Sequence, residues 1–475
     1  MVTFGEYKCN ISAMFNLANF TPWVLFTDLG IILGLLLIGK IIRVKVKLVQ
    51  KLFIPPSLLA GLLGLIFGPN GFGWLPLSNF ISVYPAVLIA VVFGALPLSS
   101  PKFRMKEVAG RVGPMWAYSQ LGMLIQWSLM GLFGLFVLKL IWPNLHDAFG
   151  VMLPTGFYGG HGTAAAIGTA FDGLGWDEAT SLGMTTATVG IILAIVGGLF
   201  FIKMAARKGD TAYIVDFADL PNELRSGLLP KEKREPSGEI TTSPISVDSL
   251  TFHLGLVVLA AFGGYMISQG VKLWLPKLEL PVFSCAFIVG LILKKIFDAT
   301  KVSQYIDPKT TSSISSTATD LLVAFGVASI KLGVVLKYAV PLIVLIVAGI
   351  VLTVFMVFYL GRHLHRKDWF EKSIFAWGWW TGTMAMGIAL LRIVDPKMMS
   401  KALDDYALAY LPCAPVEILL ITIVPIMFMA GQGLWLILIS LLISILLLFL
   451  AVKLKWWIPT KDLKPARGQQ SVSNE

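Results

Sequence analysis

Apolar runs about twenty residues long recur along the whole chain and decide the surroundings in which it can fold. A helix of about 20 apolar residues spans the hydrocarbon core of a bilayer. Such runs predict eleven spans, near residues 23–42, 53–69, 80–98, 115–142, 179–202, 250–271, 280–293, 316–334, 338–360, 402–428 and 433–452. Only 14% of the 475 residues are charged, whereas soluble domains carry about 25%. We therefore expect an all-α polytopic membrane protein with about 11 transmembrane helices.

The positive charges of the chain are distributed unevenly between its loops. Lysine and arginine collect on the cytoplasmic side of membrane proteins. If residues 1–22 lie outside and each run crosses once, all but six of the 38 Lys and Arg residues fall on the cytoplasmic side. The exceptions are Lys8, Lys139, Lys272, Lys277, Lys331 and Lys337. The net charge of +11 thus indicates an orientation in the plasma membrane, with the N-terminus outside and the C-terminus cytoplasmic, and not a nucleic-acid partner.

Two further apolar segments, 147–172 and 373–394, do not fit the pattern of complete spans. A full crossing by the first segment would move every later loop to the other side and remove the charge asymmetry. We therefore predict that both segments are re-entrant hairpins. The first would enter the membrane from outside and the second from the cytoplasm.

The two halves of the chain resemble each other. Residues 53–69 are similar to residues 279–295, and the Gly-Thr pair at 162–163 corresponds to the Gly-Thr pair at 382–383. Each half then contains five spans, with one hairpin between the fourth and the fifth. Because five is odd, the second half would be inserted upside down. Such an inverted repeat is typical of secondary transporters.

The predicted organisation of the chain follows from these spans. It comprises an external segment 1–22, a first repeat 23–202, a cytoplasmic linker 203–248, a second repeat 249–430, an extra span 431–455 and a cytoplasmic tail 456–475. The motifs HExxH and GxSxG are absent from the sequence, and its three cysteines lack the spacing of metal ligands. We therefore expect no enzyme and no bound cofactor.

The segment 156–175 is rich in glycine although it lies in a chain built for lipid. Non-helical backbone at membrane depth is tolerated where it is buried in protein or lines a water-filled cavity. Glycines permit a sharp turn before a helix that we predict to begin at Thr163, and a helix N-terminus binds anions. We expect that a Cβ at Gly162 would be excluded. The predicted substrate-binding residues are Gly160, His161, Gly162, Thr163, Thr381, Gly382, Thr383 and Arg392.

Structural roles are open alternatives for several of these residues. Glycines in membrane helices also allow neighbouring helices to pack closely. His161 fits a structural hydrogen bond as well as it fits a titrating group. Arg392 is three residues from Asp395 and could form a surface ion pair with it.

Ionisable side chains inside spans are costly and are commonly functional. Asp320 is the first candidate for a ligand of a coupling cation, with Thr317 and Thr319 as nearby oxygen donors, and Glu417 is the second. For Asp28, in the first span, pairing within the scaffold is an equal alternative. The predicted sodium-binding residues are Asp320, Thr317, Thr319, Glu417 and Asp172.

The motifs 159-GGHGTAAA-166 and 54-IPPSLLAGLLG-64, together with the two five-span halves, resemble the glutamate:sodium symporter family. The resemblance implies sodium-coupled symport of glutamate or a similar anionic amino acid, a homodimer, and an elevator-like movement of a core against a scaffold. A sodium-coupled carrier of another di- or tricarboxylate is the alternative among transporters. An ion channel is the alternative from another class, although channels usually build selectivity from rings of identical loops.

Overall fold

The computed structural model describes residues 19–99, 112–208, 210–211, 226–243, 245–274, 280–395 and 399–463. Helices dominate these ranges, which contain no strand. Eight helices are long and apolar enough to cross a membrane. The protein is therefore an all-helical, multi-pass membrane protein, as the apolar runs predict. Most of the predicted external segment and much of the predicted tail and linker lie outside the described residues.

Three of the eleven predicted spans are helices that do not belong to this group of eight. α4 (Pro56–Phe67) has only 12 residues. α14 (Val282–Ala299) and α15 (Pro308–Ala328) are longer but carry more polar or charged side chains. All three pack against other helices, α15 against both α4 and α5 and α14 against α5. Neighbouring helices thus cover much of the surface that these short or polar helices would otherwise expose to lipid.

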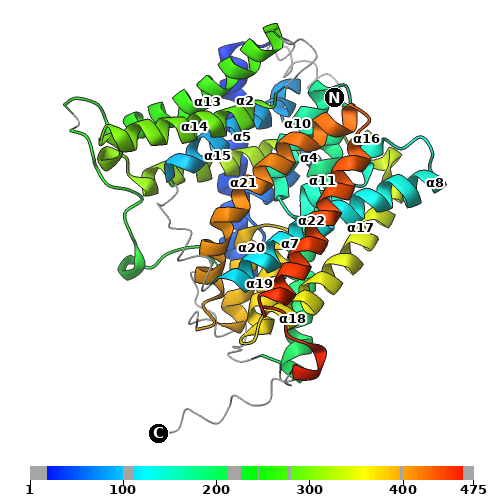
Figure 1. Ribbon diagram of the computed structural model, residues 1–475. Coiled ribbons are helices and arrows are strands. Elements are labelled where there is room, and N and C mark those ends of the chain that lie inside the picture. Colours follow the sequence, from blue (N-terminus) through cyan, green and yellow to red (C-terminus); the bar gives the residue numbers. More distant parts are fainter. Residues whose placement is uncertain are drawn as a thin grey trace.

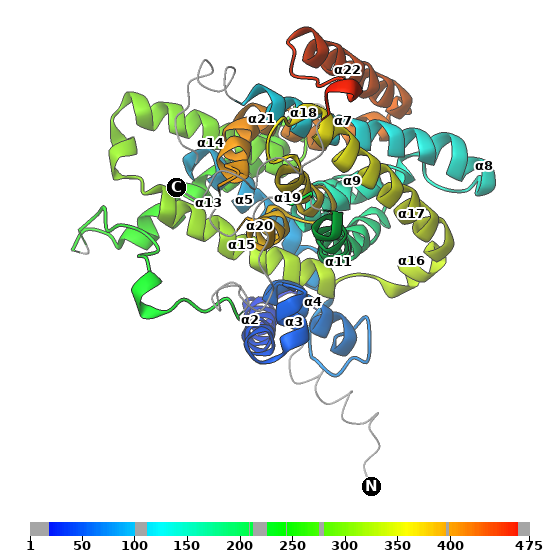
Figure 2. The same cartoon turned by 90° about the horizontal axis from the view of Figure 1, so that it is seen from below.

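The helices separate into two bundles, which Figure 1 and Figure 2 show from two directions. The first bundle packs α15 and α14 against α5, and α2 against α4. Its helices are α2 (Pro22–Lys45), α4, α5 (Tyr84–Ser99), α13 (Ser249–Trp274), α14 and α15. We call it the scaffold bundle.

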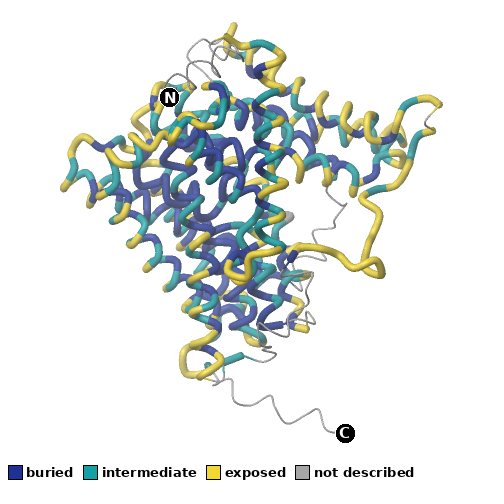
Figure 3. Tube along the Cα trace, turned by 180° about the vertical axis from the view of Figure 1, so that it is seen from behind, coloured by how far each residue is buried: buried dark blue, intermediate teal, exposed yellow. Residues whose placement is uncertain are grey.

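The second bundle contains the remaining long helices and both predicted hairpins. Its helices are α7 (Gly113–Leu132), α9 (Met152–Phe157), α10 (Gly160–Gly173), α11 (Ala179–Lys208), α17 (Ala339–Phe355), α19 (Trp369–Thr381), α20 (Met384–Val394), α21 (Ala402–Met429) and α22 (Gly433–Lys453). Large aromatic side chains such as Trp377 and Trp380 are fully buried within it. In Figure 3 the buried residues accordingly gather in the middle of the molecule. We call it the core bundle.

Each bundle takes equivalent helices from the two halves of the chain. In chain order, the scaffold bundle holds the first three predicted spans of each half, and the core bundle holds the fourth span, the broken pair and the fifth span. The helices α7 and α17 even end alike, in π-helical turns at Phe133–Leu138 and Met356–Leu360. This order supports the internal repeat, while the opposite membrane orientation of the halves stays a prediction.

Asp28 has the structural role that was one of its two alternatives. Its buried carboxylate accepts hydrogen bonds from the backbone amide of Ser78 at 2.8 Å, the Ser78 hydroxyl at 2.6 Å and the Tyr84 hydroxyl at 2.8 Å. A buried carboxylate needs such partners because it has lost its water. Asp28 therefore ties α2 to the start of α5 within the scaffold bundle.

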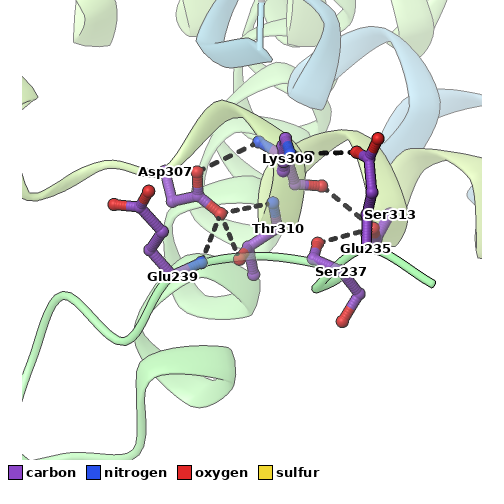
Figure 4. A network of polar contacts seen from close by, with 7 residues as sticks. All are labelled: Glu235, Ser237, Glu239, Asp307, Lys309, Thr310 and Ser313. Carbon is purple, nitrogen blue, oxygen red and sulfur yellow. Dashed lines mark hydrogen bonds and ion pairs between the residues drawn. The ribbon is translucent and has the colours of Figure 1, made fainter. Parts of the chain in front are cut away.

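The described part of the linker lies along the scaffold bundle (Figure 4). Asp307 caps the first turn of α15 and accepts hydrogen bonds from the Thr310 amide at 2.8 Å and from the Glu239 amide at 3.1 Å. The Ser313 hydroxyl donates to the Ser237 carbonyl at 3.3 Å. The linker is otherwise largely exposed, as the yellow segment of Figure 3 shows. The described part of the linker thus fastens to the start of α15 at Asp307.

Candidate functional site

Each of the two predicted hairpins contains a helix break inside the core bundle. In the first, α9 ends at Phe157 and α10 begins at Gly160. In the second, α19 ends at Thr381 and α20 begins at Met384. The helices α19 and α20 lie side by side, so the second chain segment reverses its direction at the break. That these segments re-enter the same membrane face stays a prediction.

The two breaks contact each other. Gly160 has a φ of +60°, in the left-handed region that favours glycine. A Cβ added there would lie 3.0 Å from the Gly382 carbonyl oxygen and 3.2 Å from a methyl group of Thr383. Three of the predicted substrate-binding residues, Gly160, Gly382 and Thr383, are therefore brought together. The helix starts at Gly160 and not at the predicted Thr163. The backbone turns at Gly160 itself, which is the single residue with a positive φ between Phe157 and Thr163.

The surroundings of Gly162 differ from those predicted from the sequence. It lies in the first turn of α10, and a Cβ there would meet only the Ile89 side chain of α5, at an ordinary distance of 3.7 Å. The expectation that a Cβ at Gly162 would be excluded is therefore wrong. The steric demand falls on Gly160, and on Gly159, whose Cβ would overlap the Thr163 side chain.

A stripe of glycines on α11 supports both hairpins, and sequence reasoning missed it. Gly183, Gly190 and Gly197 are spaced by seven residues and share one face of the helix. A Cβ at Gly183 would lie 3.3 Å from a side-chain atom of α10, and one at Gly197 would lie 2.6 Å from the Trp377 ring. A Cβ at Gly190 would overlap the carbonyl oxygen of Thr381. The seven-residue spacing was a visible signal, but only the fold shows what the stripe carries.

The second break leaves polar groups available. Thr383 is the N-cap residue of α20 and makes no side-chain capping bond, and the next residue, Met384, is exposed. The first N–H groups of a helix have no partner within the helix. The Thr381 hydroxyl, in contrast, is buried and donates to the Trp377 carbonyl at 2.6 Å. Thr383 rather than Thr381 is therefore free to contact a ligand.

His161 is buried directly after the first break. Its Nε2 atom shares a hydrogen bond with the Thr188 hydroxyl of α11 at 3.0 Å. Its Nδ1 atom has no hydrogen-bond partner among the described residues. One ring nitrogen thus holds α10 on α11, while the other remains unsatisfied.

Two predicted charged site residues lie at the far ends of the hairpin helices. At 1.5 Å per residue, Asp172 is about 18 Å along α10 from Gly160, and Arg392 is about 12 Å along α20 from Met384. Asp172 accepts a hydrogen bond from the Thr180 hydroxyl at 2.7 Å. The structure thus does not bring either residue to the breaks through its helix position.

The alternative ion pair of Arg392 is absent. The Asp395 carboxylate accepts instead from the backbone amides of Met399 at 2.9 Å and Ser400 at 2.7 Å. Arg392 forms no ion pair with any described residue. Its guanidinium group is therefore not committed within the part of the chain that the structure describes.

Asp320, Thr317 and Thr319 lie on α15 of the scaffold bundle, whereas the helix breaks belong to the core bundle. Asp320 lies beside Ser57, in the first turn of α4. The hydroxyls of Thr317 and Thr319 donate to backbone carbonyls of their own helix, at 2.9 and 2.8 Å. A carboxylate beside a helix N-terminus also has a structural role, because it stabilises the unpaired amides there.

Glu417 lies in the core bundle and is linked to both hairpins through aromatic side chains. Its carboxylate accepts a hydrogen bond from the Tyr410 hydroxyl at 3.0 Å. Tyr410 stacks on Tyr406 at 5.6 Å between ring centroids, Tyr406 packs on Trp379 at 4.4 Å, and Trp379 packs on Tyr158 at 4.9 Å. Trp379 lies in α19, and Tyr158 directly precedes the first break. Packed aromatic rings thus connect the Glu417 carboxylate to both hairpins.

Uncharged polar groups near Glu417 were not predicted. Gln120 of α7 is buried beside Cys413, one helical turn before Glu417, and neither its amide nitrogen nor its amide oxygen has a hydrogen-bond partner among the described residues. The Tyr406 hydroxyl is buried without a partner as well. Unsatisfied buried polar atoms are rare because they cost stability. A dehydrated cation could use such oxygens together with the carboxylate.

Comparison with known protein families identifies the family of the chain that carries these helix breaks. Residues 25–385 match the sequence profile of the sodium/glutamate symporters. The chain belongs to the sodium/glutamate symporter family. The match confirms the resemblance seen in the sequence and makes the protein a multi-pass membrane transporter. It spans both helix breaks of this symporter but stops before Arg392 and Glu417. No curated protein matches the chain.

The two neighbouring glycines of the first break provide a matched test. We expect Gly160→Ala to weaken glutamate binding by about tenfold or more, because a non-glycine residue in the left-handed region costs about 1–2 kcal/mol. Gly162→Ala should bind within about twofold of the unchanged protein, since its Cβ meets only Ile89 at 3.7 Å. Binding of radiolabelled glutamate to purified protein measures both. Equal glutamate affinities in the two variants would show that the first helix break is not part of the binding site.

Proposed function

We propose that this symporter carries glutamate, or a similar anionic amino acid, together with sodium by alternating access. The observation that carries the proposal is the contact between Gly160 and the Gly382–Thr383 break in the core bundle. Two helix starts there offer unpaired N–H groups and about half a positive charge each. A substrate carboxylate is the matching chemical group.

The coupling cation requires a dehydrated site with negative charge. Glu417 supplies the charge within the bundle that holds both breaks, and unpartnered oxygens lie on neighbouring side chains, on Gln120 beside Cys413 and on Tyr406, which stacks on Tyr410. Asp320 is the alternative ligand, on the scaffold bundle. We assign sodium to Glu417 because its aromatic contacts lead directly to both hairpins.

An elevator-like movement of the core bundle against the scaffold bundle completes the proposal. α10 packs against α5 and α15 across the boundary between the bundles. Near the first break this contact is apolar, with Ile89 facing Gly162. An apolar contact can slide without breaking hydrogen bonds, so movement at this boundary would have to break only local polar contacts such as that between the Ser284 and Thr422 hydroxyls, at 2.6 Å. A homodimer belongs to the proposal through the family resemblance alone.

Uptake into proteoliposomes tests the proposed function. An inward sodium gradient should drive accumulation of labelled glutamate, and dissipating the gradient should stop it. Unlabelled aspartate should compete better than succinate or citrate if the substrate is an amino acid. Preferred competition by succinate or citrate would indicate a carrier of di- or tricarboxylates. Sodium flux that continues without any substrate would indicate a channel.

The positions on either side of each hairpin test the membrane topology. In a variant without native cysteines, Asn144→Cys and Asp177→Cys should both react with an impermeant thiol reagent from outside, because a re-entrant segment returns to its own side. Lys367→Cys and Lys401→Cys should both react from the cytoplasmic side. All four positions are exposed. Labelling of Asn144→Cys and Asp177→Cys from opposite faces would show that the segment between them crosses the membrane.

A further inference from the structure

A cavity lies at one end of the core bundle, away from the helix breaks. It is open to one side, has a volume of about 410 Å³, and is lined by the start of α7, the end of α18 (Gly361–Leu364), the start of α19 and the residues after α22. Figure 1 shows the ends of α18, α19 and α22 close together at one end of the molecule. The charge distribution places this end on the cytoplasmic side. None of the residues of the two breaks lines this cavity.

The lining of this cavity is strongly basic. Its charged residues are Arg366, Lys367, Lys372, Lys455 and Asp405. Lys372 and Asp405 form an ion pair at 2.9 Å. The other three cations form no ion pair with any described residue. The cavity therefore carries an excess of three positive charges and suits an anion.

A buried histidine adds a polar atom that needs a partner. His365 lines the cavity, is only 5% exposed, and its Nε2 atom has no hydrogen-bond partner among the described residues. Its ring is held edge-on against Tyr118, with 4.8 Å between the centroids. Burial, and secondly the charge of Lys372, hold the pKa of His365 well below its usual range. The ring is therefore neutral and, in the Nε2–H tautomer, would donate one directed hydrogen bond to an anion's oxygen.

The remaining wall places the cavity at the boundary between lipid and water. The span α22 ends at Lys453, and Trp456 follows it and lines the cavity. Tryptophan is enriched at this depth of the membrane. Trp456 packs directly on Gly113, where a Cβ would overlap its ring, so the start of α7 faces the cavity. Pro114 and Met115 of this first turn line it as well.

We propose that this cavity binds the phosphate group of an anionic phospholipid from the cytoplasmic leaflet. Three unpaired cations and the neutral His365 donor match the oxygens of a phosphodiester, and the volume of about 410 Å³ accommodates the headgroup. Basic pockets between helices on this side of a membrane recognise such headgroups. The bound lipid would hold the start of α19, the first arm of the second hairpin, against α7 and α22.

Binding of radiolabelled phosphatidylglycerol to the full-length protein in dodecyl maltoside micelles, which contain no phosphate, tests this proposal. The triple variant Arg366→Gln, Lys367→Gln, Lys455→Gln should bind at least tenfold more weakly. A matched control removes three exposed charges elsewhere, with Lys47→Gln, Lys51→Gln and Lys231→Gln, and should bind within twofold of the unchanged protein. An equal loss of phosphatidylglycerol affinity in the two triple variants would show that positive charge attracts the lipid without a specific site. That result would overturn the proposed site.

Two further measurements test whether His365 contacts the phosphate directly and whether the phosphate belongs to a lipid or to a soluble molecule. His365→Phe keeps a ring against Tyr118 and leaves the charge unchanged, and it should weaken phosphatidylglycerol binding about fivefold. Unchanged binding in His365→Phe would contradict a directed contact. Glycerol 3-phosphate should displace the lipid only at far higher concentration. Binding of glycerol 3-phosphate that matches the lipid in affinity would assign the cavity to a soluble phosphate and overturn the lipid assignment.

Discussion

Gly190→Val is expected to abolish sodium-driven uptake. Gly190 faces the second helix break, and even a single Cβ would overlap the Thr381 carbonyl oxygen. That oxygen belongs to backbone, so it cannot turn aside as a side chain would. The break would have to shift, which would change the positions of Gly382 and Thr383 relative to Gly160. We expect uptake below about 1% of the unchanged protein, a loss of roughly 2.7 kcal/mol or more in transition-state stabilisation.

Three variants control this experiment. Gly34→Val places the same side chain where no atom lies within 4 Å, and it should leave uptake unchanged. Gly197→Ala acts on the same α11 stripe but meets the Trp377 ring, away from the break, so it should reduce thermal stability more than glutamate affinity. Gly190→Ala gives a smaller displacement of Thr381. Uptake is compared per molecule of monodisperse protein. If Gly190→Ala and Gly190→Val both transport normally, the position of the Thr381 carbonyl is irrelevant to function.

The sequence predicts helices well where hydrophobicity alone decides, and poorly where packing decides. Apolar runs locate the helices, the glycine cluster locates the first break, and the repeated Gly-Thr pair locates the second. Within 159-GGHG-162, however, any of the three glycines can adopt a positive φ, and the contact with Gly382 and Thr383 selects Gly160. α15 is a related case. Its polar residues make it a weak span by composition, but α4 and α5 cover it.

The candidate site follows the same division. Charged residues in spans attract notice at once, which is why Asp320 and Glu417 were both predicted. The distribution of helices between two bundles then separates them, and no property of the single residues contains that information. Gln120 and Tyr406 were missed because neutral polar side chains are common in membrane helices. Their significance comes from burial without a hydrogen-bond partner, which only the packed structure reveals.

The carboxylate that holds sodium can be identified by comparing two isosteric variants. Glu417→Gln is expected to raise the half-saturating sodium concentration by about ten- to a hundredfold, because the lost contact to a cation is worth about 1.5–3 kcal/mol. Tyr410→Phe removes only the hydrogen bond to Glu417, so it should shift the sodium dependence by about threefold or less. Initial rates of glutamate uptake at graded sodium concentrations measure both effects.

Asp320→Asn should behave differently if its carboxylate serves the scaffold bundle. Its contact with Ser57 places it at the N-terminus of α4, where loss of the charge costs about 0.3–1 kcal/mol of stability. A lower melting temperature with unchanged sodium dependence is therefore the expected result. The opposite outcome, with sodium dependence altered in Asp320→Asn and preserved in Glu417→Gln, would move the cation to the scaffold bundle. A cation held by the scaffold bundle could not travel with the breaks, so that outcome would also contradict an elevator in which substrate and sodium move together.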